Sequence, residues 1–253
     1  MIKDWPKQIS MKIIKLDATE STNTFLKDLS RTDIVDDYTV VWAKHQTKGR
    51  GQMNGSWQTE PGKNLTFSVL KKISGFQLDQ HFMLNMIVSI AVFRTLAEFQ
   101  IPKIKVKWPN DIMSGSKKIC GILIENNLVG AALKSLVIGI GLNVNQTVFP
   151  GNPKASSLFN QTGQMYDLET VLQRLLQNLK LGFAQFETGP SEDVFKEYQS
   201  LLFRKGIAST FQSGNGKMFS GIIQGVSDDG RLRVQLEDDC LAEFDIKEIT
   251  LLY

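Results

Sequence analysis

The sequence predicts an α/β (α+β) protein in which a mixed sheet is covered by helices and is followed by a small all-β domain. Three observations lead to this prediction: short apolar runs rich in Val and Ile, two long helical patterns, and a change after Arg204 to short alternating segments separated by turn residues. The 253 residues, of which 42% are hydrophobic, can bury a substantial core. We therefore expect a large domain over residues 1–204 and a small one over residues 205–253.

The expected strands are short apolar runs, as buried strands are. They cover residues 12–16, 39–43, 65–70, 119–124 and 136–142. The expected helices carry apolar residues at steps of three and four. The first runs from about Asp79 to Phe99, and the second is marked by Leu168, Val171, Leu172, Leu175, Leu179 and Phe183. Strands and long helices alternating in this way favour a mixed α/β sheet.

After Arg204 the chain consists of short alternating segments separated by turn signals at residues 213–216, 228–230 and 237–239. Such spacing over roughly 50 residues predicts a small β domain and suits an SH3-like barrel. Other small barrels share this spacing, so the barrel type stays open at this point.

Composition excludes several classes of protein. The net charge is +3 and basic residues are spread along the chain, which is a weak argument for nucleic acid or an anionic membrane as partner. Cys120 and Cys240 lie far apart and outside any metal-ligand spacing, so neither a disulfide nor a zinc site is expected. The start lacks the apolar region of a signal peptide, and no segment offers the roughly 18 apolar residues that cross a membrane. We expect a cytoplasmic protein without a membrane partner.

The most informative stretch is polar and glycine-rich and runs from Gln46 to Trp57, between two expected strands. Its glycines let backbone N–H groups approach an anion, Arg50 adds a fixed cation, and Trp57 can stack on a planar group. The alternative is a flexible surface loop, which glycine and arginine alone favour. The spacing of a P-loop is absent.

A second stretch, Lys-Trp-Pro-Asn-Asp at residues 107–111, precedes Lys117, Lys118 and the expected buried strand over residues 119–124, which is followed by Glu125. An acid such as Asp111 can hold Mg²⁺ through phosphate, and a lysine entering a strand can neutralise a carboxylate or phosphate. Taken alone, these residues are an ordinary turn and a solvated strand edge.

Two further patterns complete the set. Gly139 and Gly141 interrupt an apolar strand before Asn143, which marks a place where a ligand or backbone comes close. Residues 21–24, Ser-Thr-Asn-Thr, form a plain helix N-cap whose hydroxyls and amides can also bind a polar heterocycle.

Together and in this order, the motifs resemble the catalytic domain of biotin-protein ligases. The resemblance rests on Ser-Thr-Asn, Gln-Thr-x-Gly-Arg-Gly, a tryptophan eleven residues after that glutamine, Lys-Trp-Pro-Asn-Asp, Lys-x-x-Gly-Ile-Leu-x-Glu and Gly-x-Gly-x-Asn. It spans Ser21 to Asn145, and the C-terminal β domain is similar as well. It implies a fold like that of class II aminoacyl-tRNA synthetases and lipoate ligases, with ATP, biotin and Mg²⁺ as ligands.

The resemblance also implies residue roles. Biotin would be held by Ser21, Thr22, Asn23, Gln46, Gly49, Arg50, Gly51, Lys118, Gly121 and Leu123. ATP would be held by Trp57, Asn110, Asp111, Lys118 and Asn143. Arg50 and Lys118 would be the catalytic residues, since they would hold the biotin carboxylate and the phosphate, and Asp111 would help with magnesium through the phosphates.

The chain departs from the family pattern in two respects. Gln52 stands where the family often has a second arginine, and Met53 and Gly55 stand where it has further basic residues. The chain also begins almost at the catalytic domain, so we expect the short form without an N-terminal helix-turn-helix and no sequence-specific DNA binding.

The expected activity is activation of biotin by ATP to biotinyl-5′-AMP and pyrophosphate, followed by transfer to one lysine of a biotin carboxyl carrier protein. Two rivals stay open: a lipoate ligase, and a catalytically silent biotin sensor, which pyrophosphate release would distinguish. A homodimer is a further open alternative.

Overall fold

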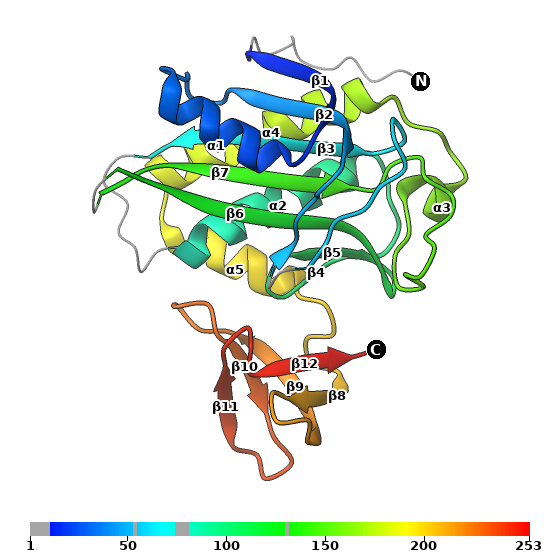
Figure 1. Ribbon diagram of the computed structural model, residues 1–253. Coiled ribbons are helices and arrows are strands. Elements are labelled where there is room, and N and C mark those ends of the chain that lie inside the picture. Colours follow the sequence, from blue (N-terminus) through cyan, green and yellow to red (C-terminus); the bar gives the residue numbers. More distant parts are fainter. Residues whose placement is uncertain (1–10, 53–54, 74–80, 130–131) are drawn as a thin grey trace.

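The computed structural model describes residues 11–52, 55–73, 81–129 and 132–253 and has two layers of helices around one large sheet, with a smaller sheet below (Figure 1). The large sheet has seven strands in the order β1-β2-β3-β7-β6-β5-β4. Their bounds are Ile13–Thr19, Val40–Gln46, Leu65–Lys72, Ile104–Lys107, Asp111–Ser114, Lys117–Val129 and Ala132–Leu142 for β1 to β7.

The sheet is mixed, as predicted, because β1 and β2 run parallel while the other neighbouring pairs are antiparallel. The five predicted strands are confirmed as β1, β2, β3, β6 and β7. One detail was wrong. The strand beginning near Lys12 is not buried, since β1 lies at the edge of the sheet and its residues are half-buried or exposed.

Helices cover both faces of this sheet (Figure 1). They are α1 (Thr22–Thr32), α2 (His81–Glu98), α3 (Leu158–Thr162), α4 (Leu168–Thr188) and α5 (Ser191–Leu201). The two long helices that periodicity predicted are confirmed as α2 and α4, although the predicted start at Asp79 lies outside the described residues.

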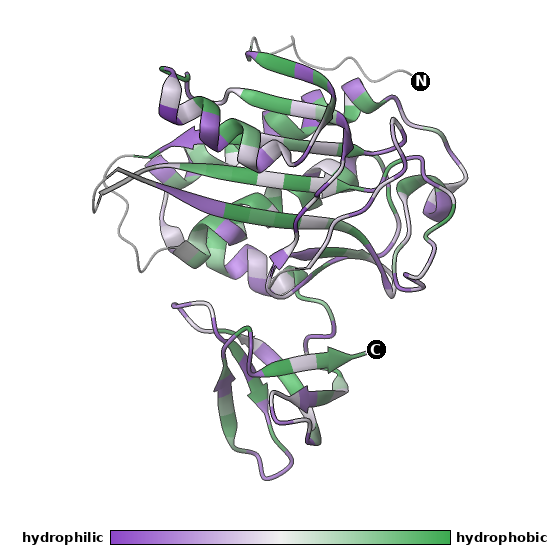
Figure 2. Ribbon diagram, viewed as in Figure 1, coloured by the Kyte–Doolittle hydropathy of each residue, from purple (hydrophilic) through white to green (hydrophobic). Residues whose placement is uncertain are grey.

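The two faces of the sheet follow from alternation along its strands. On one face Leu26 of α1 packs against Val41, Leu70 and Val137. The opposite face carries the larger core, in which strand residues such as Phe67, Ile122 and Ile140 pack with α2 and α4. Figure 2 shows these strands as hydrophobic for most of their length.

The small domain is a sheet of five antiparallel strands in the order β11-β10-β9-β8-β12, which confirms the predicted all-β character. Its strands are Ala208–Ser213, Met218–Val226, Leu232–Gln235, Leu241–Phe244 and Ile249–Leu252 for β8 to β12. The closure into an SH3-like barrel and the boundary at Arg204 stay predictions.

The two domains share one apolar core, because Phe211 and Ile223 of the small domain belong to the same buried cluster as α2. The buried Trp108 Nε1 donates a hydrogen bond of 2.8 Å to the carbonyl oxygen of Gly230. Within the described ranges, none of the helices is long and apolar enough to span a membrane.

Candidate active site

The floor of the candidate site is made by alternate positions of three neighbouring strands, and all of these residues except Leu123 are small. Thr66, Gly141 and Gly121 lie side by side in register, and Ser68, Gly139 and Leu123 form the next row. Their large neighbours in sequence point to the opposite face, into the core. The small side chains therefore leave a hollow on the α1 face of the sheet.

This hollow is a pocket with both polar and apolar lining residues, as small-molecule sites have. The structure brings together in its wall all but one of the residues expected to hold biotin: Ser21, Thr22, Asn23, Gln46, Arg50, Gly51, Lys118, Gly121 and Leu123. Gln52 and Trp57 also line it. Gly49 is buried beside the pocket and does not line it.

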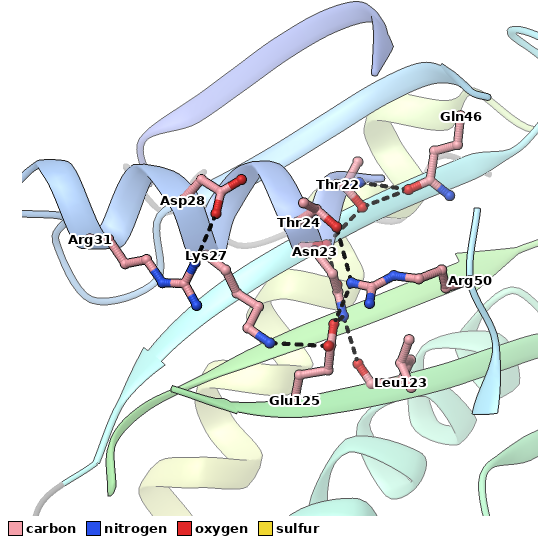
Figure 3. A network of polar contacts seen from close by, with 11 residues as sticks. Thr22, Asn23, Thr24, Lys27, Asp28, Arg31, Gln46, Arg50, Leu123 and Glu125 are labelled. Carbon is pink, nitrogen blue, oxygen red and sulfur yellow. Dashed lines mark hydrogen bonds and ion pairs between the residues drawn. The ribbon is translucent and has the colours of Figure 1, made fainter. Parts of the chain in front are cut away.

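The start of α1 presents polar groups to the pocket. Both the amide nitrogen and the Oγ1 of Thr22 donate to Gln46 Oε1, at 2.7 and 3.0 Å (Figure 3). Ser21 is the N-cap residue, but its side chain makes no capping hydrogen bond. The predicted position of the N-cap is confirmed. The buried Ser21 hydroxyl can bind a ligand that lies in the pocket beside Thr22.

Asn23 is used differently from its neighbours. Its amide nitrogen donates to the Leu123 carbonyl at 3.3 Å and to Glu125 Oε2 at 2.7 Å, and its oxygen accepts from Ser68 Oγ at 2.5 Å (Figure 3). A Cβ on Gly139 would lie 2.3 Å from Asn23 Oδ1. Gly139 therefore makes room for a protein side chain, and Asn23 forms the wall of the pocket with its polar groups already paired.

The glycine-rich stretch folds back on itself as a narrow hairpin. Trp57 N donates to the Gly49 carbonyl at 2.9 Å, and Gly51 N donates to the Gly55 carbonyl at 2.6 Å. A Cβ on Gly49 would lie 2.2 Å from the Trp57 carbonyl oxygen. The requirement for glycine at this position thus comes from the close approach of two main chains. Met53 lies outside the described residues.

Trp57 lies flat on the sheet next to the pocket. A Cβ on Gly141 would be 2.3 Å from Trp57 Cε2, and one on Gly121 would be 3.1 Å from Cζ3. The Lys118 Nζ lies 5.6 Å from the centre of the indole ring. The indole Nε1 is buried and, among the described residues, has no hydrogen-bond partner. A donor in this position is suited to an acceptor on a ligand.

Two further cavities adjoin the pocket, and Trp57 and Lys118 line both of them. One contains Asn143 and the loop over residues 146–155. The other contains Asn110 and Asp111 and is closed by the small domain through residues such as Ile223. Four of the residues expected at ATP thus surround Lys118 but fall into two groups.

The amides of Asn110 and Asn143 hold main chain in place. Asn110 Nδ2 donates to the Ile122 carbonyl at 2.6 Å, and Asn143 Nδ2 donates to the Ser156 carbonyl at 2.9 Å. Both side chains are buried. Each bond uses only the amide nitrogen, so the side-chain oxygen of each residue can meet a ligand.

A cluster of charge joins the two groups. Lys118 Nζ lies 2.5 Å from Asp111 Oδ1, and Lys107 Nζ lies 3.7 Å from Asp111 Oδ2. Burial lowers the pKa of Lys107, and the charge of Lys118 adds to this while Asp111 opposes it. Lys107 was missed as a site residue, although it begins the Lys-Trp-Pro-Asn-Asp motif that pointed here.

The fit of a metal ion to this cluster is poor. Asp111 is engaged by two lysines, and the described part of the chain contains no group of three or more His, Cys, Asp or Glu side chains that could hold a metal. Mg²⁺ prefers several oxygen ligands in octahedral geometry. That Asp111 helps to hold Mg²⁺ through the phosphates of ATP stays a prediction. The two proposed reaction steps do not depend on it.

Arg50 crosses from the glycine-rich hairpin to the rim of the pocket. Its Nη2 donates to Thr24 Oγ1 at 3.0 Å and to Glu125 Oε2 at 3.1 Å (Figure 3). Glu125 was missed as a functional residue. The sequence signal for it was its place at the end of Lys-x-x-Gly-Ile-Leu-x-Glu, two residues after Leu123 and thus on the pocket face of β6.

Comparison with known proteins gives consistent results. The family described as "Biotin/lipoate A/B protein ligase family" matches residues 16–143, and "Biotin protein ligase C terminal domain" matches residues 210–250. The bifunctional ligase/repressor BirA of Bacillus subtilis is 28% identical over 89% of this chain and 70% of its own. The biotin–[acetyl-CoA-carboxylase] ligase of Mycobacterium tuberculosis is 27% identical over 85% and 79%. A solved structure of biotin protein ligase from Aquifex aeolicus with biotin and ATP has a TM-score of 0.80 and 26% identity over 95% of this chain and 98% of that one.

Proposed function

This chain belongs to the biotin/lipoate A/B protein ligase family. We propose which of its pockets binds each substrate of the reaction. The chain is an ATP-dependent biotin-protein ligase. The C-terminal match, which extends beyond the part shared with lipoate ligases, favours biotin over lipoate as the substrate.

The observation that carries the assignment of sites is the position of Lys118. It lines the pocket whose other walls are the expected biotin residues, and it also lines both cavities that hold the expected ATP residues. A group that meets both substrates is where their reacting atoms would come together. We assign the pocket between α1 and the sheet to biotin and the cavities beyond Trp57 to ATP.

In the biotin pocket, Ser21, Thr22 and Gln46 are the groups suited to the ureido ring. The ring buries two N–H groups and one carbonyl, each of which needs a hydrogen-bond partner. Gly121 and Leu123 would lie against the apolar part of the molecule, with Asn23 as a wall. Arg50 and Gly51 also line the pocket, and the carboxylate would lie beside them.

In the first step the biotin carboxylate attacks the α-phosphate of ATP, and pyrophosphate leaves. Negative charge builds on the transferring phosphoryl group, and Lys118 and Arg50 would stabilise it. Trp57 would meet the adenine with its ring, and Asn143 would accept or donate a hydrogen bond beside it. Asp111 would orient Lys118, from which it lies 2.5 Å.

In the second step the amine of the acceptor lysine attacks the acyl carbon of the mixed anhydride, and AMP leaves. The hairpin over residues 49–57 would keep water from the adenylate until the acceptor arrives. We propose a biotin carboxyl carrier protein as the acceptor, by analogy with the biotin–[acetyl-CoA-carboxylase] ligase of Mycobacterium tuberculosis. The small domain would act as an SH3-like module that closes the ATP cavity, with the boundary at residue 204.

We also propose that the protein is cytoplasmic, that Mg²⁺ accompanies ATP and that the protein binds no specific DNA sequence. A homodimer is an open alternative. None of them alters the assignment of the pockets.

The test of function is label transfer. Labelled biotin, ATP and a biotin carrier domain should yield a labelled carrier, and pyrophosphate should appear in the same amount. A carrier with its acceptor lysine changed to arginine is the matched control. A catalytically silent sensor would bind biotin without pyrophosphate release, and a lipoate ligase would label the carrier only when lipoate replaces biotin.

A further inference from the structure

Glu125 is the most heavily engaged carboxylate around the biotin pocket. Its Oε2 accepts from Asn23 Nδ2 at 2.7 Å and from Arg50 Nη2 at 3.1 Å, and its Oε1 accepts from Lys27 Nζ at 3.1 Å (Figure 3). The side chain of Glu125 is 19% exposed, whereas that of Arg50 is 46% exposed. The carboxylate is therefore the fixed partner of the pair, and the arginine is the part that it holds.

The charge state of Glu125 fits this role. Burial by itself raises the pKa of Glu125, but hydrogen bonds from Asn23 and Lys27 and the charge of Arg50 outweigh burial, so its pKa lies below the ordinary value. The group is thus an anion at neutral pH. An anion in this position holds a guanidinium in one orientation more firmly than a neutral acceptor would.

The geometry places Glu125 behind Arg50 with respect to the ligand. Arg50 lines the biotin pocket, while Glu125 does not. Thr24 and Glu125 both bind Nη2, and within the described residues Nε and Nη1 make no hydrogen bond. A guanidinium that is anchored by one nitrogen keeps its other N–H groups for a second, planar acceptor such as a carboxylate.

We propose that Glu125 is a positioning residue that anchors Arg50 across the mouth of the pocket, so that the free edge of the guanidinium meets the carboxylate of biotin. This inference rests on the proposed role of Arg50 in binding biotin. It assigns to Glu125 no contact with the substrate. Lys27 pairs with Oε1 of Glu125, whereas Arg50 pairs with Oε2.

The test compares biotin with biotin methyl ester, which keeps both rings but lacks the anionic carboxylate. Dissociation constants are measured by titration calorimetry on the full chain. Glu125→Gln should weaken binding of biotin about fivefold to tenfold and change binding of the ester less than twofold, because only the carboxylate needs an oriented Arg50. Thr24→Val removes the second anchor without touching Asn23 or Lys27, and it should produce the same selectivity to a smaller degree.

Lys27→Met is the matched control, because it removes the cation on the other oxygen of Glu125 and leaves the contact with Arg50 in place. It should change neither constant more than twofold. If Glu125→Gln fails to fold, Thr24→Val carries the test alone. Equal weakening of biotin and ester would overturn the proposal, because it would mean that Glu125 supports the ring wall through Asn23. Unchanged or tighter biotin binding would also overturn it. Failure of the unchanged protein to bind biotin would instead overturn the proposed function on which it rests.

Discussion

Lys118 is the residue to which we assign contacts with both substrates. Its main chain is held on both sides, since its N–H donates to the Lys154 carbonyl at 2.8 Å and its carbonyl accepts from Ser156 N at 2.9 Å. The side chain then reaches the junction of the biotin pocket and the two adjoining cavities. The main chain of Lys118 thus holds the local structure, while its side chain faces the proposed site. A substitution of the side chain can therefore test function without removing the main-chain bonds.

Lys118→Ala should slow pyrophosphate release by about 10² to 10³, because a charge aimed at the reacting phosphate is lost. Its thermal midpoint should fall by only a few degrees, since the main-chain bonds remain. Lys117→Ala is the control, as Lys117 Nζ donates to the Pro153 carbonyl outside the three cavities. Normal pyrophosphate release by Lys118→Ala would remove this lysine from the mechanism.

The residue types of the site could be predicted from the sequence, but their pairing could not. The motifs identified Arg50, Trp57 and Lys118, whose chemistry is visible in the residue itself. The partner of Arg50 is Glu125, 75 residues away, and the glycine beneath Trp57 is Gly141. Such partners are set by strand order and register, which no local pattern contains. The sequence predicted that a ligand or backbone comes close to Gly141, where the structure has the indole of Trp57.

Gln52 gives a test at a position where this chain departs from its relatives. The residue lines the biotin pocket and the cavity that the small domain closes. An arginine there would offer a full charge to the adenylate phosphate, so Gln52→Arg should slow escape of biotinyl-adenylate by about threefold to tenfold. The adenylate would be formed in a single turnover, diluted without acceptor, and followed as it leaves the protein.

The control for this experiment is Gln52→Met, which has similar length but no charge and should not slow escape. A competing effect is built into the site, because Asp245 and Glu248 line a groove that also contains Gln52. If these carboxylates hold the new guanidinium, escape from Gln52→Arg will be as fast as from the unchanged protein, and the idea that Gln52 weakens the hold on the adenylate will have failed.

At the scale of elements, hydrophobic periodicity identified the long helices and the apolar strands of the large sheet, and it missed the shortest strands. The helices α2 and α4 and five strands of the large sheet were predicted, since each carries enough apolar positions to set a period. The strands β4 and β5 span four residues each, and α5 has only Tyr198 fully buried, so their patterns are too brief or too weak. These elements are ordered by contacts with the rest of the fold.

The strand β7 permits a paired test of the two substrate sites. Gly139 and Gly141 lie on the same face, two residues apart, yet a Cβ would meet Asn23 at the first and Trp57 at the second. Gly139→Ala should therefore raise the Michaelis constant for biotin, and Gly141→Ala that for ATP, each by about tenfold or more. Steady-state kinetics with each substrate varied decides the matter. The same substrate affected in both variants would contradict the assignment of Trp57 to the adenine side.

At the scale of the whole molecule, the small domain lines one of the cavities that we assign to ATP. Ile223, Ile246 and Leu251 line a cavity together with Asp111 and Lys118. The Lys-Trp-Pro-Asn-Asp motif also binds the small domain directly, through Trp108 and the Gly230 carbonyl. A change at this contact should thus affect stability and nucleotide binding together.

Gly230 is the residue at which this coupling can be measured. Its φ is +91°, and a Cβ would lie 2.2 Å from Cγ of Phe82 in α2. Gly216, in the same small domain, has a φ of +87°, but a Cβ there would meet nothing within 4 Å. Gly216→Ala therefore introduces backbone strain alone, of about 1 kcal/mol. Gly230→Ala adds a clash between the domains, which typically costs about 1–3 kcal/mol more.

We expect the free energy of unfolding of Gly230→Ala to be lower than that of Gly216→Ala by the cost of the clash, about 1–3 kcal/mol. We also expect Gly230→Ala to raise the Michaelis constant for ATP several-fold, while the Michaelis constant for biotin changes little. The reason is that a Gly230 loop pushed away from Phe82 disturbs its hydrogen bond with Trp108, and Trp108 lines the ATP-side cavity but not the biotin pocket. Denaturant unfolding and steady-state kinetics on both variants supply the comparison. Equal losses of stability with unchanged ATP kinetics would mean that the two domains meet without acting on each other.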